Sequence, residues 1–191
     1  MALEKPTPLP FPEADMNLPV FASEGQENIV EFAERFGSLQ GKFVFCSSVE
    51  ELELKFKQLC ELNQWTKIFC EEEPWRVLID QDFLETNISE CQVAVTGCEY
   101  LVARTGSMVL SSRLQGRVPS VYAPIHICIA RSSQVVPDIS DALTALQVKY
   151  QGVIPSQISF ATGPSRTADI EKTLVVGVHG PGEVYCFIVD E

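Results

Sequence analysis

Hydrophobic residues in the first half of the chain alternate between helical spacing and short continuous runs. Apolar positions three and four residues apart predict helices over residues 23–37 and 48–59, and Pro74 beside three acids predicts another over 73–84. Apolar runs over 43–46, 67–70 and 92–96 are typical of strands buried on both faces. This alternation predicts an α/β fold, with an open, largely parallel sheet and flanking helices.

The second half changes to strands separated by polar, glycine-containing loops. The apolar runs lie at 107–110, 125–129, 157–160 and 184–188, and a helix is predicted over 138–150 with Asp138 as its N-cap. No repeat or linker separates the halves, so we expect one sheet in a single domain of residues 23–191. Five prolines among the first twenty residues predict an extended arm over residues 1–22.

Charge is distributed unevenly between the two halves. The chain of 191 residues has a net charge of −12; residues 1–91 carry 18 acidic and 7 basic side chains, a net −11, and the remainder carries 8 and 7, a net −1. Such acidity disfavours nucleic acids and anionic membranes as partners. No apolar stretch is long enough to span a bilayer and no signal peptide is apparent, so a cytoplasmic location is expected.

Seven cysteines are spread singly among apolar neighbours, which predicts reduced, buried thiols. The closest pair, Cys91 and Cys98, is too far apart for the C-x2-C or C-x4-C knuckles of iron–sulfur and zinc sites. No flavin or nicotinamide motif is present either, so we expect no metal site and no cofactor in this chain. A reactive thiol at Cys98 is the alternative to a buried one.

The candidate chemistry lies in four loops of the second half: 103–107, 124–126, 162–171 and 177–182. They contain both histidines of the chain and two arginines, Arg104 and Arg166. In an open α/β sheet, loops at the carboxyl ends of strands form one ligand-binding crevice, so we expect these loops to meet there. The candidate ligand-binding residues are Arg104, Thr105, Gly106, Ser107, Gly163, Pro164, Ser165, Arg166, Thr167, Glu171, Gly177 and Gly180.

Residue chemistry suggests a role for each group in these loops. The planar fork of Arg166 matches a carboxylate or phosphate, although Asp169 could instead pair with it to hold the turn. His179 is the main acid/base candidate because histidine can exchange protons near neutral pH, with a purely structural hydrogen bond as the alternative. His126 is either a site residue or a wall of the pocket. The candidate catalytic residues are therefore His179, Asp169 and His126.

Two of these stretches resemble a known family. The string TGPSRTADIE at 162–171, followed by LVVGVHGP at 174–181, resembles the signature of the lactate-utilisation protein C family, the LUD-domain proteins. ARTGS at 103–107, PIHI at 124–127 and VPD at 136–138 match further family segments in order, so the resemblance covers residues 26–191. It departs at Arg104, where many members have an acidic residue before Thr-Gly.

The resemblance implies a fold like that of the sugar-phosphate isomerases and CoA transferases. It also implies a role in oxidising L-lactate to pyruvate beside iron–sulfur partner subunits. This chain would then be a component without clusters that binds a small anionic ligand. The alternative is a stand-alone enzyme or binding protein for a small carboxylate, acyl-CoA or phosphorylated substrate, in which Arg166 binds the anion and His179 moves the proton. Assembly into a homo-oligomer stays open.

Overall fold

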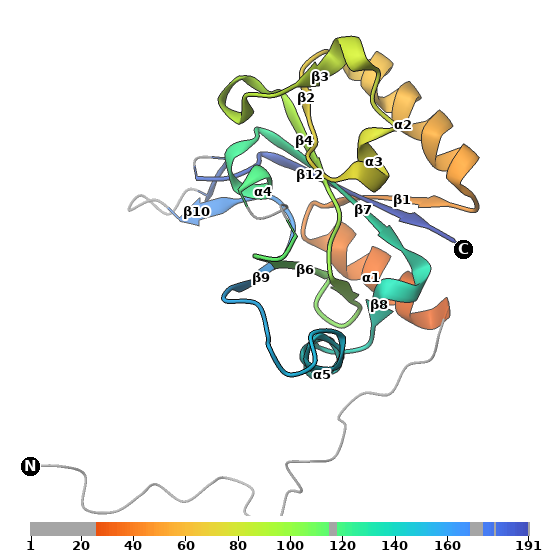
Figure 1. Cartoon of the computed structure of the whole chain (residues 1–191), viewed down its shortest axis with the longest axis vertical. Helices are drawn as coiled ribbons and strands as arrows, with labels where there is room; N and C mark the ends of the chain where they lie inside the picture. The colour runs from red at the N-terminus through yellow and green to blue at the C-terminus, as the bar shows by residue number, and fades with distance from the viewer. Residues whose placement is uncertain (1–25, 115–117, 169–173, 178, 191) are drawn as a thin grey trace, which may run out of the picture.

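A computed structural model describes residues 26–114, 118–168, 174–177 and 179–190, and Figure 1 shows its arrangement. The predicted arm over residues 1–22 lies outside this part. The helices are α1 (Gln26–Ser38), α2 (Val49–Asn63), α3 (Glu73–Arg76), α4 (Pro119–Tyr122) and α5 (Ile139–Lys149), with 3-10 turns at Gln81–Phe83, Ile88–Glu90 and Ser132–Gln134. No described helix is long and apolar enough to cross a membrane.

The larger sheet has six parallel strands. Its order is β1 (Lys42–Cys46), β12 (Glu183–Val189), β7 (Ile125–Arg131), β4 (Val93–Thr96), β2 (Ile68–Phe69) and β3 (Leu84–Glu85). β12 and β7 are neighbours in this order and pair over seven positions, from Glu183 with Ile125 to Val189 with Arg131. The predicted α/β class and largely parallel sheet are therefore confirmed.

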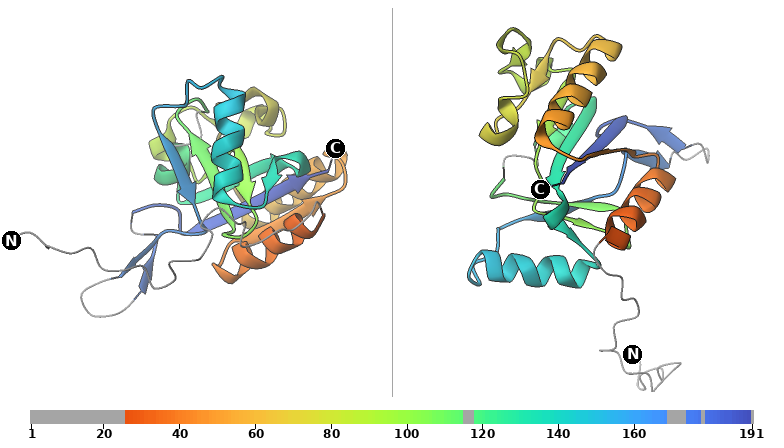
Figure 2. Two further views of the ribbon diagram at one scale, coloured as in Figure 1. Left: turned by 90° about the horizontal axis from the view of Figure 1, so that it is seen from below. Right: turned by 90° about the vertical axis from the view of Figure 1, so that its right-hand side faces the viewer.

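A second sheet of four strands corrects the expectation that both halves share one sheet. Its order is β8 (Val135–Val136), β5 (Tyr100–Val102), β6 (Ser107–Ser111) and β9 (Ile158–Ala161), and only the β8–β5 pair is parallel. A separate hairpin, β10 (Arg166–Ala168) and β11 (Leu174–Val176), extends away from both sheets in Figure 2. Thus β7 and β12 complete the first sheet, whereas the other strands of the second half build their own.

The core divides into layers on the two faces of the large sheet. One face packs against α2 through Leu52 and Phe56, whereas the other meets α1 and the second sheet through Phe32, Phe36 and Met108. α5 covers the outer face of the second sheet with Ala142 and Leu146. Each of the two sheets therefore has apolar contacts on both faces.

The predicted helix over 73–84 is wrong. α3 ends at Arg76, and the backbone continues in tight turns, in which the amides of Leu78 and Ile79 donate to the carbonyls three residues earlier, those of Trp75 and Arg76. The side chain of Asp80 then accepts a hydrogen bond from the amide of Asp82 and begins a new 3-10 turn. The acids and Pro74 do mark a helix start, but the helix lasts one turn and gives way to separate turns.

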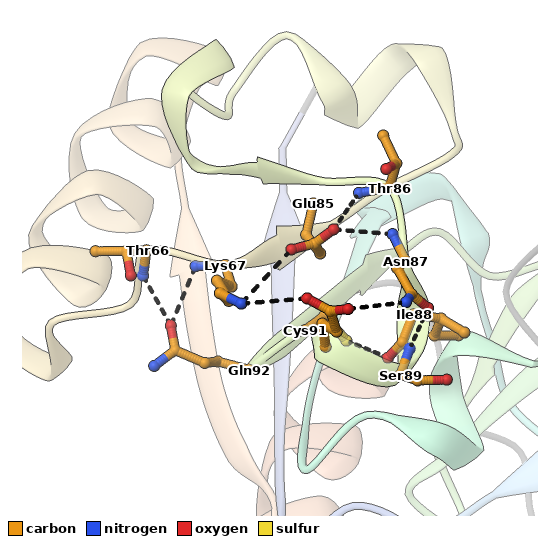
Figure 3. A network of polar contacts seen from close by, with 10 residues as sticks. Thr66, Lys67, Glu85, Thr86, Asn87, Ile88, Ser89, Cys91 and Gln92 are labelled. Atoms are coloured by element: carbon orange, nitrogen blue, oxygen red, sulfur yellow. Dashed lines mark hydrogen bonds and ion pairs between the residues drawn. The ribbon is translucent and has the colours of Figure 1, made fainter.

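Polar contacts hold the short strands β2, β3 and β4 together (Figure 3). The side-chain oxygen of Gln92 accepts hydrogen bonds from the amides of Thr66 and Lys67, at 2.9 and 3.1 Å. The carboxylate of Glu85 accepts from the amides of Thr86 and Asn87, both at 2.9 Å. These bonds satisfy backbone donors at a sheet edge whose strands are too short to do so alone.

Candidate functional site

A cavity of about 320 Å³ lies between the two sheets, and we call it the inter-sheet cavity. Its walls come from β6, β9, α4, the starts of β7 and β12, and the two loops on either side of the β10–β11 hairpin. The lining residues are Met108, Leu110, Ser120, Val121, His126, Gln157, Ser159, Phe160, Ala161, Gly163, Ser165, His179, Gly180, Pro181 and Val184. Five predicted site residues are therefore brought together: His126, Gly163, Ser165, His179 and Gly180.

His126 forms part of the cavity wall from the second position of β7. It is 1% exposed, and its Nε2 lies 2.8 Å from the hydroxyl oxygen of Thr96 on the neighbouring strand β4. Burial lowers the pKa of His126 from 6.5 to about 4, because a charged imidazole would lose its hydration there. At neutral pH this histidine is uncharged and can serve as a hydrogen-bonding group.

His179 is exposed and is positioned by two loops that cross each other. The amide of Ser165 donates to the carbonyl of Pro181, and the amide of Gly177 donates to the carbonyl of Ser165, both at 2.9 Å. A Cβ on Gly180 would lie 2.9 Å from the Cβ of Ser165, so only glycine allows this approach. These contacts hold the loop that follows β11, and with it His179, against the loop that precedes β10.

Beyond His179 lies a second depression of about 420 Å³, which we call the outer hollow. It is lined by Val121, Tyr122, Ala123, Pro124, Gly177, His179 and Gly180. It shares Val121, His179 and Gly180 with the inter-sheet cavity, so the two are neighbours. Gly177, another predicted ligand-binding residue, belongs to this hollow.

The two glycines of the turns at 106 and 163 have a packing role. Gly106 has φ +61° and a Cβ there would lie 2.6 Å from the amide nitrogen of Phe36; Gly163 has φ +78° and a Cβ would lie 2.7 Å from the carbonyl oxygen of Leu39. Both turns therefore need glycine for its conformation and for close approach to the C-terminal end of α1. Gly106 lies outside the lining of the cavity, whereas Gly163 contributes to it.

Neither predicted arginine lines the cavity. The Nε and Nη2 of Arg104 lie 2.9 and 2.7 Å from the carboxylate oxygens of Asp138, the N-cap of α5. This pairing lowers the pKa of Asp138, the hydrogen bond from Arg104 being its main cause. Arg166 is exposed, and its guanidinium donates to the carbonyl of Leu39. Arg104 thus serves the start of α5, and Arg166 attaches the hairpin to the end of α1.

The remaining predicted residues are placed as follows. Thr105, Ser107 and Thr162 form a line of hydroxyls with successive oxygens 2.8 Å apart, outside the lining of the cavity. Pro164 is buried at the turn and Thr167 lies in β10. Asp169 and Glu171 lie outside the described residues, so their predicted roles, and the pairing of Asp169 with Arg166, stay predictions.

The cavity lies at the opposite end of the large sheet from the one expected. His126 is at the start of β7 and Gly182 directly precedes β12, so these segments lie at the amino ends of parallel strands. The expectation of a crevice at the carboxyl ends is therefore wrong for this site. The second sheet explains the difference, because β6 and β9 close the space beside those amino ends.

Sequence reasoning missed a buried carboxylate, that of Glu99, whose side chain is 0% exposed. Burial would raise its pKa, but hydrogen bonds from Lys149, Ser111 and Tyr150 outweigh this and hold the pKa of Glu99 below its ordinary value. No local pattern marked this residue, since its partners lie 12 to 51 positions away. The line of Ser159 and Gln157 along the cavity was missed for the same reason.

The seven cysteines are all free and buried, as predicted. The neighbouring thiol of Cys128, together with burial, raises the pKa of Cys98 well above its ordinary value, which argues against a reactive thiol there. Within the described ranges, no group of three His, Cys, Asp or Glu side chains is placed to hold a metal ion.

The loops that form the cavity also carry the family signature, and comparison with known proteins shows the family. The chain matches the LUD domain over residues 22–189. It belongs to the LUD-domain family. A DUF162 family protein from Deinococcus radiodurans, known from its crystal structure, has the same fold, with a TM-score of 0.66 and 18% identity over 88% of this chain and 99% of that one.

Other LUD-domain relatives are named lactate utilization protein C. The protein from Bacillus licheniformis is 39% identical over 132 residues, which cover 68% of this chain and 53% of the relative. The Bacillus subtilis protein is 38% identical over 118 residues, covering 59% and 49%. The Geobacillus kaustophilus protein is 38% identical over 105 residues, covering 53% and 44%. This LUD-domain chain spans about half the length of the curated relatives it matches.

Proposed function

We propose that this chain is a component without iron–sulfur clusters in an L-lactate oxidation system, and that it acts beside iron–sulfur partner subunits. In this role it binds a small organic acid in the inter-sheet cavity. One observation carries the proposal: residues of the family signature, Gly163, Ser165, His179 and Gly180, meet around this cavity from the two loops on either side of the β10–β11 hairpin. The names of the relatives supply the lactate system.

The lining supports binding of an acid by hydrogen bonds. His126 is neutral and buried, so its imidazole can orient a hydroxyl or carbonyl group without a competing charge. His179 lies where the cavity adjoins the outer hollow, and its imidazole N–H can donate a hydrogen bond to a carboxylate. The hydroxyls of Ser159 and Ser165 add further donors. These groups bind and orient the acid, and electrons are passed on elsewhere in the system.

A growth and pull-down experiment tests the system-level role. A strain that lacks this chain should fail to grow on L-lactate, and the wild-type chain should restore growth. A tagged chain recovered from lactate-grown cells should carry along proteins that contain iron–sulfur clusters, detected by iron and sulfide assay. Normal growth of the deletion strain, together with recovery of no such partner, would refute the proposal.

Titration of the purified chain tests the cavity. L-Lactate and pyruvate should both bind, and His179→Asn should weaken both by about tenfold, the loss of one hydrogen bond to a charged group. Val148→Ala is the control, because Val148 is 76% exposed on α5 and outside the cavity lining. Equal affinity of wild type and His179→Asn would place the site elsewhere.

The second candidate is a stand-alone enzyme on a small carboxylate, favoured by the presence of two imidazoles in one cavity. His179 would take a proton from the methyl carbon of pyruvate while His126 donates a hydrogen bond to the carbonyl oxygen of the resulting enolate. NMR in D2O would follow the exchange of the methyl protons for deuterium. Exchange that is no faster with wild type than with His179→Asn excludes this reaction.

A further inference from the structure

The inter-sheet cavity and the outer hollow lie on either side of one short wall. Val121, His179 and Gly180 line both, so the two spaces adjoin at the imidazole of His179. A ligand longer than the cavity can therefore reach the hollow past the side chain of His179.

The volumes of the two spaces indicate a ligand larger than lactate. The cavity of about 320 Å³ falls within the range of about 300–1,000 Å³ that is usual for small-molecule sites. Lactate has only six non-hydrogen atoms and is smaller than the ligands that sites of this size usually bury. The outer hollow of about 420 Å³ adds more space than the cavity itself provides.

The outer hollow has the chemistry of a ring-binding surface. Tyr122 stands at its edge with 70% of its surface exposed, next to Val121, Ala123 and Pro124. A tyrosine ring left in water beside an apolar hollow offers a face on which another ring can stack.

The lining of the two spaces limits the number of negative charges on the ligand. Among the described lining residues of both spaces there is no lysine, arginine, aspartate or glutamate. A phosphate or a second carboxylate would lose hydration there without a fixed cation to replace it. The lining therefore suits a head with one negative charge rather than an acyl-CoA or a sugar phosphate.

We infer that the site takes a two-part ligand: a singly charged 2-hydroxy or 2-oxo acid head in the inter-sheet cavity, and an aromatic tail that stacks on Tyr122 in the outer hollow. The nature of the head rests on the proposed function, whereas the tail is deduced from the size and lining of the two spaces. Lactate is then a minimal fragment of the preferred ligand.

Calorimetric titration with four acids tests this inference. L-Lactate is the head, 2-hydroxyhexanoate adds an aliphatic tail, 3-phenyl-L-lactate adds an aromatic one, and L-malate adds a second charge. We expect 3-phenyl-L-lactate to bind at least tenfold more tightly than L-lactate, 2-hydroxyhexanoate to bind in between, and L-malate to bind most weakly. Tyr122→Ala should remove about tenfold of the gain from the phenyl group and leave L-lactate unchanged.

Phe83→Ala is the matched control, because Phe83 is also an exposed ring but lies outside both spaces. It should preserve the order of the four acids. Equal affinity for L-lactate and 3-phenyl-L-lactate, or an equal effect of Tyr122→Ala on both, overturns the inference and leaves the proposed function standing. Binding of none of the four acids overturns both.

Discussion

Glu99 and Glu183 show how much the surroundings of one carboxylate matter. Each has a lysine and a tyrosine hydroxyl as partners: Lys149 and Tyr150 for Glu99, Lys42 and Tyr185 for Glu183. The side chain of Glu99 is 0% exposed, whereas that of Glu183 is 46% exposed. A lysine and a tyrosine thus bond both carboxylates, but water reaches only that of Glu183.

This difference in exposure predicts that replacing the two glutamates by alanine destabilises the protein to different extents. Glu99→Ala should lower the free energy of unfolding by about 3 kcal/mol, because it leaves the buried hydroxyl of Ser111 without its acceptor and releases the end of α5. Glu183→Ala should cost less than about 1 kcal/mol, as exposed ion pairs do. Urea unfolding measured by circular dichroism gives both values. Equal costs would mean that burial does not decide the contribution of this carboxylate.

His126 predicts a dependence of stability on pH. Its pKa falls from 6.5 in the unfolded chain to about 4 on folding, so the unfolded state binds the extra proton between these values. Stability is therefore complete above pH 6.5 and decreases as the pH falls towards 4, by about 3 kcal/mol at about 1.4 kcal/mol per unit.

His126→Gln removes this titration and keeps a side chain that can hydrogen-bond to Thr96. Its free energy of unfolding, measured in urea at half-unit steps of pH, should vary less than that of the wild type between pH 6.5 and 4. Parallel curves for the two proteins would show that His126 is protonated as easily in the folded chain as in the unfolded one.

At the scale of elements, the turn between β5 and β6 docks the second sheet on α1 through Gly106. Gly106→Ala introduces both a positive φ and a Cβ 2.6 Å from the amide nitrogen of Phe36, so we expect a loss of about 3 kcal/mol or more. Gly152 also has a positive φ, +81°, but nothing lies within 4 Å of its Cβ position, so Gly152→Ala should lose only about 1 kcal/mol.

Thermal unfolding of the two glycine variants separates the cost of a positive φ, which both share, from the cost of the steric clash with α1, which only Gly106→Ala has. The difference between them measures the contact of the turn with α1, which is also the contact that positions the neighbouring hydroxyl line at Ser107. A loss for Gly106→Ala no greater than that for Gly152→Ala would show that the turn can move away from the helix at no cost.

Which elements the sequence predicts depends on whether local pattern or distant packing decides them. α1, α2 and α5 each have an apolar stripe, and Ser48 and Asp138 are the N-caps at which α2 and α5 begin. Local pattern is therefore enough to predict these helices. The second sheet escaped prediction because its central strands β5 and β6 are covered on both faces, by the large sheet and by α5. In sequence they are indistinguishable from strands of a parallel sheet.

The candidate site divides in the same way. Glycine-rich and polar loops identified Gly163, Ser165, His179 and Gly180, which do meet around one cavity. The role of Arg104 depends on Asp138, 34 positions away, and the turn at Gly106 depends on α1. Such partners are defined only by the fold, so residue type alone could not reveal the ion pair of Arg104 or the close approach at Gly106.

At the scale of the whole molecule, the two sheets share one core and should unfold together. Leu101 of β5 is fully buried in the layer between them, whereas Trp65 and Trp75 pack on the opposite face of the large sheet, beside α2. Leu101→Ala should lower the free energy of unfolding by about 3 kcal/mol, the usual cost of a cavity at a fully buried leucine.

Tryptophan fluorescence and circular dichroism, followed through the same urea titration, show whether Leu101→Ala destabilises both sheets or only the second one. In a single cooperative unit, Leu101→Ala shifts both midpoints equally, although the substitution and the tryptophans lie on opposite faces of the large sheet. Val148→Ala, at an exposed position of α5, should shift neither. A fluorescence midpoint that stays at the wild-type value while the circular dichroism midpoint falls would mean that the second sheet unfolds on its own. In that case the inter-sheet cavity would open before the large sheet melts, and ligand binding would stabilise the second sheet only.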